Sequence, residues 1–193
     1  MLLAAGQGSR FNGIKQLACV AGKTLINSTL DKYFIDTKLL QGINKLTVIL
    51  GAHAEKIRPV LPSQVDVSIA TDWQQGMGRS IGFAVSQISR DVTHIMIALG
   101  DQIAIETQDV RLLLAQSADL PDKIIAASYL EKIGAPAIFP RRYFPELECL
   151  VGDKGARVLL QRHRENVVQM PMPRAAIDID TGDDLVAWLR GKA

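Results

Sequence analysis

Short apolar runs recur along the chain, and their spacing constrains the fold more than any other feature of the sequence. Several runs are nearly continuous in apolar residues, which is typical of strands buried on both faces of a parallel sheet. Stretches with apolar residues at helical spacing lie between them, at residues 25–34, 81–88 and 110–117. This alternation predicts an α/β fold, a three-layer Rossmann-like domain with a mostly parallel central sheet. The predicted strands are residues 45–50, 65–70, 94–99, 123–128, 135–139 and 166–170.

The composition indicates a globular chain without an extended charged surface. Of the 193 residues, 48% are apolar and 22% are charged, so we expect one domain over residues 1–193. The formal net charge of +2 is too small to favour nucleic acid or an anionic membrane as a partner. The longest apolar runs also fall far short of the roughly 18 residues that a membrane span needs. We therefore expect no nucleic-acid partner and no membrane partner.

Cysteine and histidine residues are few and scattered. Cys19 and Cys149 lie far apart and form no CxxC pair, and the three histidines are equally dispersed. A zinc site and a disulfide framework are therefore poorly supported. The first six residues contain no basic leader before a long apolar core, so we expect no signal peptide. Together these features favour a reduced, cytoplasmic protein.

A glycine-containing loop follows the first predicted strand directly. Gly6 and Gly8 lack Cβ atoms, so the backbone can turn sharply there and approach a ligand closely. The exposed N–H groups of such a loop form a concave site for anions. Arg10 and Lys15 add two positive charges to it. The loop therefore predicts phosphate binding, and the alternative is a surface turn with two solvated cations.

Two well-known phosphate-binding motifs do not fit this loop. The dinucleotide pattern GxGxxG needs a third glycine where Phe11 stands. The pattern GxxxxGK[ST] needs lysine directly after Gly13, but Ile14 occupies that position. A later Gly-Lys-Thr sequence has Leu17 where the first glycine is required. The loop is therefore neither a dinucleotide fingerprint nor a P-loop.

Residues 3–17, which read LAAGQGSRFNGIKQL, resemble the signature loop of MobA-like nucleotidyltransferases, roughly LAAGxSxRMGxxKxLL. The loop is most similar to that of the molybdenum cofactor cytidylyltransferase branch. The resemblance implies a nucleotide-diphospho-sugar transferase-like fold, with the loop main chain at the base and sugar and two cations on the phosphates. Gly8 and Asn12 replace the usual Ser and Gly, and neither change touches the charges. The implied nucleotide-binding residues are Leu3, Ala4, Ala5, Gly6, Gly8, Ser9, Arg10 and Lys15.

A second loop, residues 71–80, lies between a predicted strand and a helix that we expect to begin near Ser80. Read without the resemblance, it is a flexible loop with a serine N-cap. It is similar to the second base-contacting loop of the same family, W-x-x-G-M-x-x-S. Together with Ala4-Ala5-Gly6, this loop favours CTP over GTP. The residues that it implies for nucleotide binding are Gly76, Met77, Gly78 and Ser80.

Asp101 follows Gly100 at the end of the most apolar predicted strand. A carboxylate at this position is well placed to meet a hard cation held by phosphates, although a turn or cap role is the alternative. The sequence GDQI resembles the family motif GDQP, which implies that Asp101 binds Mg²⁺ and that Gly100 contacts the nucleotide. Ile103 stands where the family has proline.

Two carboxylates, Asp178 and Asp180, precede a Thr181-x-x-Asp184 sequence that predicts a helix start. The segment resembles the closing motif D-I-D-T-P-E-D-L of the family. The resemblance implies that Asp180 is a second metal ligand, with Asp178 as a weaker candidate.

Two later segments, residues 134–147 and 152–157, resemble the motifs GxPxxFxxxxFxxL and GDxGAR of the cytidylyltransferase branch. The resemblance implies that about residues 130–185 receive the second substrate. Each basic residue of this region also has an ordinary interpretation as a solvated side chain. The implied acceptor-binding residues are Arg141, Arg142, Lys154 and Arg157.

The resemblance as a whole implies a nucleotidyltransferase that moves a cytidylyl group from CTP to the terminal phosphate of molybdopterin and releases pyrophosphate. Mg²⁺ is the implied cofactor, Arg10, Lys15 and Asp101 are the implied catalytic residues, and a molybdoenzyme or its maturation chaperone is the implied recipient. Two alternatives stay open. One is a related enzyme that acts on a sugar phosphate or another small phosphorylated acceptor. The other is a non-catalytic, nucleotide-binding protein that delivers the cofactor.

Overall fold

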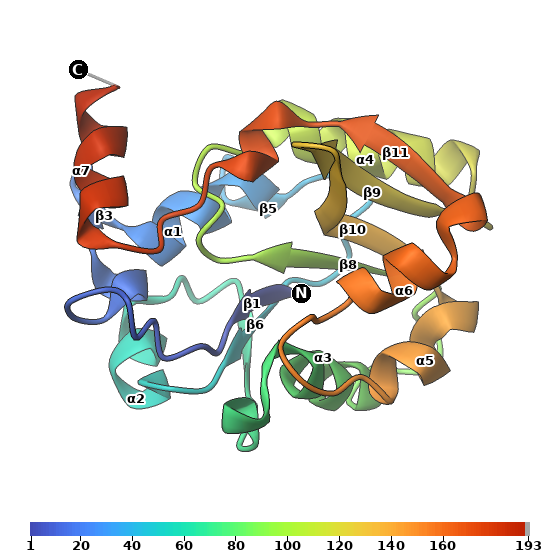
Figure 1. Ribbon diagram of the computed structural model, residues 1–193, viewed down its shortest axis with the longest axis horizontal. Helices are drawn as coiled ribbons and strands as arrows, with labels where there is room; N and C mark the ends of the chain where they lie inside the picture. The colour runs from blue at the N-terminus through green and yellow to red at the C-terminus, as the bar shows by residue number, and fades with distance from the viewer. Residues whose placement is uncertain (192–193) are drawn as a thin grey trace.

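A seven-stranded sheet forms the centre of the molecule in the computed structural model, which describes residues 1–191 (Figure 1). The strand order is β11-β9-β10-β8-β1-β6-β7. Among the seven strands of the described sheet, β10 alone runs against the others. The prediction of an α/β fold with a mostly parallel sheet is confirmed. The strands are β1 Leu2–Ala4, β6 Thr47–Leu50, β7 Asp66–Ile69, β8 His94–Leu99, β9 Ile124–Tyr129, β10 Lys132–Pro140 and β11 Val167–Pro171.

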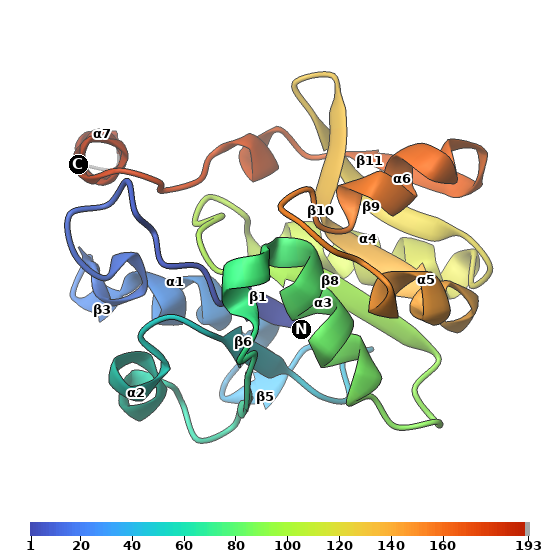
Figure 2. The ribbon, with the colours of Figure 1, turned by 60° about the horizontal axis from the view of Figure 1, so that its bottom comes forward.

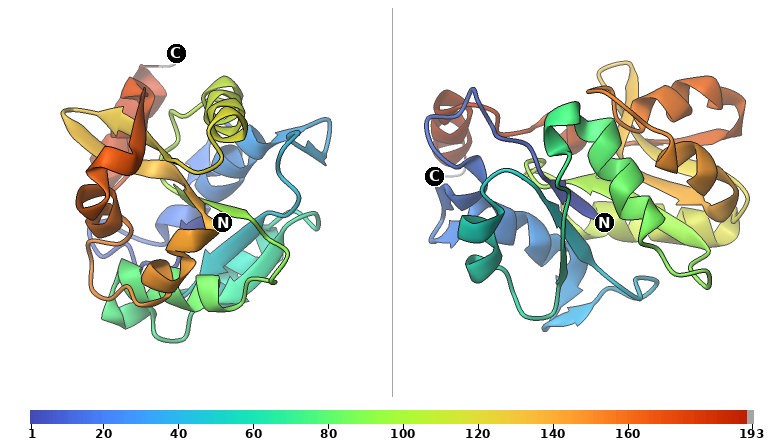
Figure 3. Two further views of the ribbon diagram at one scale, coloured as in Figure 1. Left: turned by 90° about the vertical axis from the view of Figure 1, so that its right-hand side faces the viewer. Right: turned by 90° about the horizontal axis from the view of Figure 1, so that it is seen from below.

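Helices cover both faces of the sheet, which gives the three predicted layers. The left view of Figure 3 shows α4 on one side of the sheet and α3 and α5 on the other. Two short hairpins, β2 Cys19–Val20 with β3 Lys23–Thr24 and β4 Phe34–Ile35 with β5 Lys38–Leu39, lie outside the sheet. The helices are α1 Leu25–Leu30, α2 Ala54–Ile57, α3 Met77–Ser86, α4 Thr107–Asp119, α5 Phe144–Glu148, α6 Arg157–Arg162 and α7 Gly182–Arg190.

Each buried strand contributes alternate side chains to two separate cores. In β6, Val48 and Leu50 pack in the core beneath α1, α2 and α4, whereas Ile49 packs in the core beneath α3, α5 and α6. The same division holds for Leu2 and Leu3 in β1. Because both faces are buried, the strands lack a polar face, and this explains why their sequences are nearly continuous in apolar residues.

Helix α3 begins three residues earlier than the sequence predicts. Its first residue is Met77 and its N-cap is Gly76, so the expected start near Ser80 is wrong. The polarity of Ser80 suggested a cap, but the side chain is 3% exposed and lies inside the first turns of the helix. The helix start therefore depends on the glycine and not on the serine.

The predicted helix start at Thr181 is confirmed. The hydroxyl of Thr181 accepts a hydrogen bond from the Asp184 amide, and the Asp184 side chain accepts one from the Thr181 amide, which forms a capping box. Helix α7 lies beside the loop that follows β1, as Figure 2 shows at its upper left. The domain predicted over residues 1–193 includes residues 192 and 193, which lie outside the described residues. None of the helices within residues 1–191 is long and apolar enough to cross a membrane.

Candidate active site

A cavity of about 400 Å³ opens at the edge where the parallel strands β1 and β8 end. Ligands bind at this edge in open α/β sheets because the loops that follow the strands converge there. The loop after β1, the loop before α3 and the residues after β8 all contribute to its wall. The residues that line it include Leu3, Ala4, Ala5, Gly6, Gly8, Lys15, Trp73, Gln74, Gly76, Met77, Ser80, Gly100, Asp101 and Asp153.

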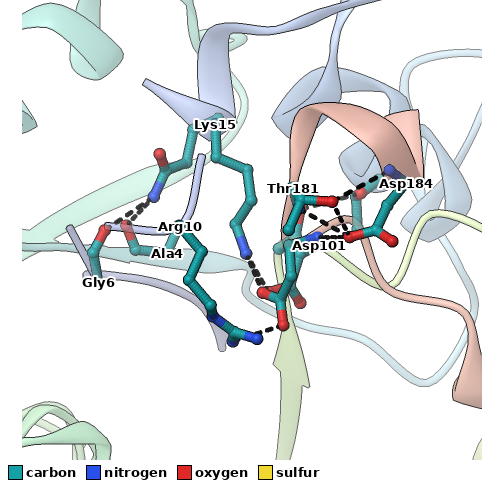
Figure 4. A network of polar contacts seen from close by, with 11 residues as sticks. Ala4, Gly6, Arg10, Lys15, Asp101, Thr181 and Asp184 are labelled. Carbon is teal, nitrogen blue, oxygen red and sulfur yellow. Dashed lines mark hydrogen bonds and ion pairs between the residues drawn. The ribbon is translucent and has the colours of Figure 1, made fainter. Parts of the chain in front are cut away.

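Lys15 joins two carboxylates that are far apart in the sequence. Its Nζ atom lies 2.8 Å from Oδ2 of Asp101 and 2.9 Å from Oδ1 of Asp180 (Figure 4). Burial alone would lower the pKa of Lys15, but the charges and hydrogen bonds of the two carboxylates outweigh it and raise the pKa above its ordinary value. Lys15 is therefore a charged, nearly buried ammonium at neutral pH, with only 8% of the residue exposed.

Arg10 contributes a second cation to this group of carboxylates. Its guanidinium donates a hydrogen bond to Oδ2 of Asp180 at 2.6 Å (Figure 4). The Arg10 side chain is 71% exposed, so this ion pair is partly screened by solvent. The structure thus brings together Arg10, Lys15, Asp101 and Asp180, and we call these four side chains the charged cluster.

A small apolar core holds Asp180 beside Asp101. Ile179 is 1% exposed and packs with Ile103, Val20 and Leu25, and its amide donates to the carbonyl of Asp101 at 3.1 Å. Ile103 stands where the family motif has proline. The side chain of Ile103 is buried in this core, where it packs with Ile179 and so helps to hold the C-terminal segment in place.

The charged cluster has the donor chemistry of a divalent-cation site. Oδ1 of Asp101 is buried and has no hydrogen-bond partner among the described residues. Partial burial, and then the charges of Asp180 and Asp101, raise the pKa of Asp178, so this third carboxylate also lies within the field of the pair. No group of three or more His, Cys, Asp or Glu side chains within residues 1–191 is arranged to hold a metal ion by itself. The chemistry of Asp101 and Asp180 thus fits a divalent cation that phosphate and water oxygens would also coordinate.

The loop before α3 forms another part of the cavity wall and is fixed against a later segment. Gly76 has φ of +99°, and a Cβ at this position would lie 2.5 Å from the backbone of Gly152. The amide of Gly78 donates to the carbonyl of Gly152 at 2.7 Å. The predicted residues Gly76, Met77 and Ser80 line the cavity, whereas Gly78 is buried in this contact and does not.

Lys154 and Arg157, two of the four predicted acceptor residues, line a second cavity of about 160 Å³. This cavity adjoins the first, because Met77, Leu99 and Asp153 line both. Its other walls are mostly apolar and include Tyr129, Gly134 and Ala135.

The other two predicted acceptor residues, Arg141 and Arg142, do not reach either cavity. They follow β10, whose last residue, Pro140, pairs with His94 at the start of β8. The side chain of Arg141 donates to the carbonyls of Ser89 and Val92. The structure therefore does not bring these two arginines together with Lys154 and Arg157, because the antiparallel direction of β10 carries them to the opposite end of the sheet.

Several residues at the cavities were not predicted. Trp73 and Gln74 belong to the quoted second loop, so the tryptophan of the family motif could have identified the first of them. Gln16 stands at an unspecified position of the signature loop and Tyr129 directly follows a predicted strand, so neither carries a signal of its own. Of the predicted loop residues, Ser9 and Arg10 do not line the cavity wall, and Arg10 reaches the site only through Asp180.

Comparisons with known proteins show which family and which relatives the chain resembles. A family model described as MobA-like NTP transferase domain matches residues 1–167. The "Bifunctional protein GlmU" of Solibacter usitatus is 31% identical over 124 residues, which are 63% of this chain and 26% of that protein. The chain therefore spans about a quarter of the length of this curated relative.

Two further similarities extend over most of the chain. The "Purine catabolism protein PucB" of Bacillus subtilis is 28% identical over 172 residues, covering 83% of this chain and 79% of that protein. A crystal structure of Rv0371C from Mycobacterium tuberculosis, described as a complex with manganese, is 27% identical with a TM-score of 0.74. The match covers 98% of this chain and 96% of that one.

Proposed function

The chain belongs to the MobA-like NTP transferase domain family and is a nucleotidyltransferase of that superfamily, and we propose that it moves a cytidylyl group from CTP to the terminal phosphate of molybdopterin. The observation that carries this proposal is the charged cluster at one end of the larger cavity. It combines two cations for phosphates with two carboxylates for a metal ion.

The proposed reaction needs little acid–base chemistry from the protein. A phosphate monoester is already anionic at neutral pH, so it can attack the α-phosphate of CTP without a strong general base. The O–P bond to the acceptor forms while the bond to pyrophosphate breaks in line. The main barrier is the repulsion between two anions, which positioning and fixed positive charges reduce.

Each member of the charged cluster has a distinct task in this proposal. Lys15 would lie between the α-phosphate and the attacking oxygen, and Arg10 would neutralise the charge that accumulates on pyrophosphate. Asp101 and Asp180 would hold Mg²⁺, which supplies Lewis-acid polarisation of the phosphate oxygens when bound. The similarity to a structure described as a complex with manganese supports a divalent ion in this site.

Phosphates at the charged cluster would place the base at the other end of the larger cavity, along the loop before α3. This end is formed by the turn after β1 and by Trp73, Gly76 and Met77. Cytosine fits a wall of backbone groups because its edge combines one amine donor with two adjacent acceptors. The sequence motifs that favour CTP lie in these two loops.

The second cavity would receive the acceptor. Its apolar walls with Tyr129 suit a planar ring system, and Lys154 and Arg157 at its rim suit a phosphate. The two cavities share Leu99 and Met77, so the acceptor phosphate would approach the nucleotide along this common wall. A molybdoenzyme or its maturation chaperone would then take up the product.

Pyrophosphate release from CTP in the presence of Mg²⁺ tests the proposal. We expect release only when molybdopterin is added, with an equal amount of cytidylylated pterin formed. Release with a sugar phosphate but not with molybdopterin would show that the acceptor is a sugar phosphate and not molybdopterin. CTP binding without any release would show a non-catalytic delivery protein. Calorimetric titration with each nucleoside triphosphate tests the base separately, and a preference for GTP would overturn the choice of CTP.

A further inference from the structure

Gln16 is a buried polar residue that the reaction steps above do not use. It is 5% exposed and follows Lys15 in the short 3-10 helix Lys15–Leu17. Its Nε2 atom donates hydrogen bonds to the carbonyls of Ala4 at 3.1 Å and Gly6 at 3.2 Å, as the dashed lines in Figure 4 show. Only the NH₂ end of the amide can bond two carbonyls, so these contacts fix the orientation of the side chain.

The carbonyl groups at the end of β1 and in the turn that follows it are hydrogen-bonded to other parts of the protein. Four successive carbonyls, those of residues 3–6, all accept hydrogen bonds from protein groups, and Gln16 supplies two of the four bonds. The other two are donated by the Gly100 amide to the Leu3 carbonyl and by the Ala52 amide to the Ala5 carbonyl, both at 2.9 Å.

The N–H groups of the same turn differ from these carbonyls in their hydrogen bonding. Within residues 1–191, the amides of Gly6, Gln7 and Gly8 donate no hydrogen bond to another protein group. All three residues line the larger cavity. These three amides are therefore available as hydrogen-bond donors to a ligand, while the carbonyls of residues 3–6 already accept bonds from the protein.

A wall of donors discriminates between nucleobases. Cytosine presents two adjacent acceptors on its pairing edge, N3 and O2, which such a wall can match. Guanine presents two adjacent donors, N1–H and N2–H₂, which would lose their bonds to water and gain none from the turn. An unmatched buried donor is more costly than the average gain from a formed bond, so the guanine edge is rejected.

We infer that Gln16 is a positioning residue that determines base specificity: it holds the carbonyls of Ala4 and Gly6 away from the cavity, so the turn accepts cytosine and rejects guanine. This inference rests on the proposed function, because it concerns which nucleotide the same site takes. Without the amide of Gln16, the two carbonyls become available to the donors of guanine.

Gln102 supplies a matched control for the loss of a buried amide. It is 2% exposed, and its Nε2 donates to the carbonyls of Ala135 at 2.9 Å and Ala175 at 2.8 Å. Neither of these carbonyls belongs to the turn after β1. Gln16→Met and Gln102→Met therefore remove the same chemical group and two carbonyl bonds each, at different places.

The test is calorimetric titration of the wild type, Q16M and Q102M with CTP and with GTP, each in the presence of Mg²⁺. We expect the wild type to prefer CTP. In Q16M we expect the Kd for GTP divided by the Kd for CTP to be at least about tenfold smaller than in the wild type. In Q102M we expect this ratio to stay within about twofold of the wild type, although both variants unfold at a lower temperature. A loss of buried structure alone would move the Tm of both variants but not the ratio.

Two results would overturn the inference, and they differ in what else they affect. A folded Q16M variant with the wild-type ratio would overturn the role of Gln16 and leave the proposed function standing. A wild-type chain that binds GTP at least as tightly as CTP would overturn the choice of CTP as well. If Q16M does not fold, Q16L, which also lacks the two donors, undergoes the same titrations with the same expected loss of the ratio.

Discussion

Two pairs of basic residues in this molecule have similar chemistry and opposite surroundings. Arg10 and Lys15 contact carboxylates at the end of the sheet where β1 and β8 finish. Arg141 and Arg142 lie at the other end, where their guanidinium groups donate to backbone carbonyls and stack on the rings of Phe144 and Tyr143. Arg142 also lies 3.9 Å from the carboxylate of Asp122, which is almost fully exposed and lines neither cavity. A cation whose partners are carbonyls and rings completes a turn, whereas a cation that faces carboxylates beside a cavity can exchange them for phosphates.

The direction of one strand causes this difference. β8 runs parallel to β1, so the residues after both strands meet at one edge. β10 runs antiparallel to β8, so the residues after it meet the start of β8 instead. A motif can therefore stand in the expected order along the chain and still place part of its residues away from the site.

Asp101→Asn tests the site half of this comparison and has the largest expected effect. The amide cannot hold a divalent cation as the carboxylate does, so we expect turnover to fall by two to three orders of magnitude, about 3–4 kcal/mol of transition-state stabilisation. The fold should be retained, since Asp101 is not part of an apolar core. The measurement is pyrophosphate release at saturating Mg²⁺ and CTP.

Asp119→Asn, at the exposed end of α4, is the control for Asp101→Asn and should keep the wild-type rate. Turnover of Asp101→Asn within a few-fold of the wild type would show that Asp101 does not ligate the metal. The charged cluster would then differ from Arg141 and Arg142 in its position on the sheet but not in metal binding.

Arg157→Ala tests the second cavity, where we expect an intermediate effect. Arg157 lines this cavity and is exposed at the start of α6, so its loss removes a phosphate contact without opening a core. We expect the KM for the acceptor to rise about tenfold, with the KM for CTP within about twofold of the wild type. Arg111→Ala, an exposed residue on α4, is the matched control. A change in the KM for CTP instead would place Arg157 at the nucleotide.

The sequence alone predicted the strands of the sheet and the chain segments that meet at the charged cluster. Apolar runs without alternation identified the strands, because strands buried on both faces need no polar residues. Gly100-Asp101 and the Thr181 capping sequence identified the ends that meet at the charged cluster. Strand direction was not predictable, because an antiparallel strand between parallel neighbours has the same apolar pattern. The role of Gln16 was not predictable either, since it depends on carbonyls 10 and 12 residues away.

Arg141→Ala tests whether the basic pair at the other end of the sheet has a purely structural role, and its expected effect is the smallest. Its loss leaves the carbonyls of Ser89 and Val92 without these donors and removes the stacking on Phe144, so we expect stability to fall by about 1–2 kcal/mol. Urea denaturation measures this loss, and steady-state kinetics should give wild-type KM values for CTP and for the acceptor. Arg157→Ala is the reciprocal variant, with a changed KM for the acceptor and little change in stability. If Arg141→Ala raised the KM for the acceptor instead, the acceptor would have to extend to both ends of β8, and the division between the two pairs of cations would be lost.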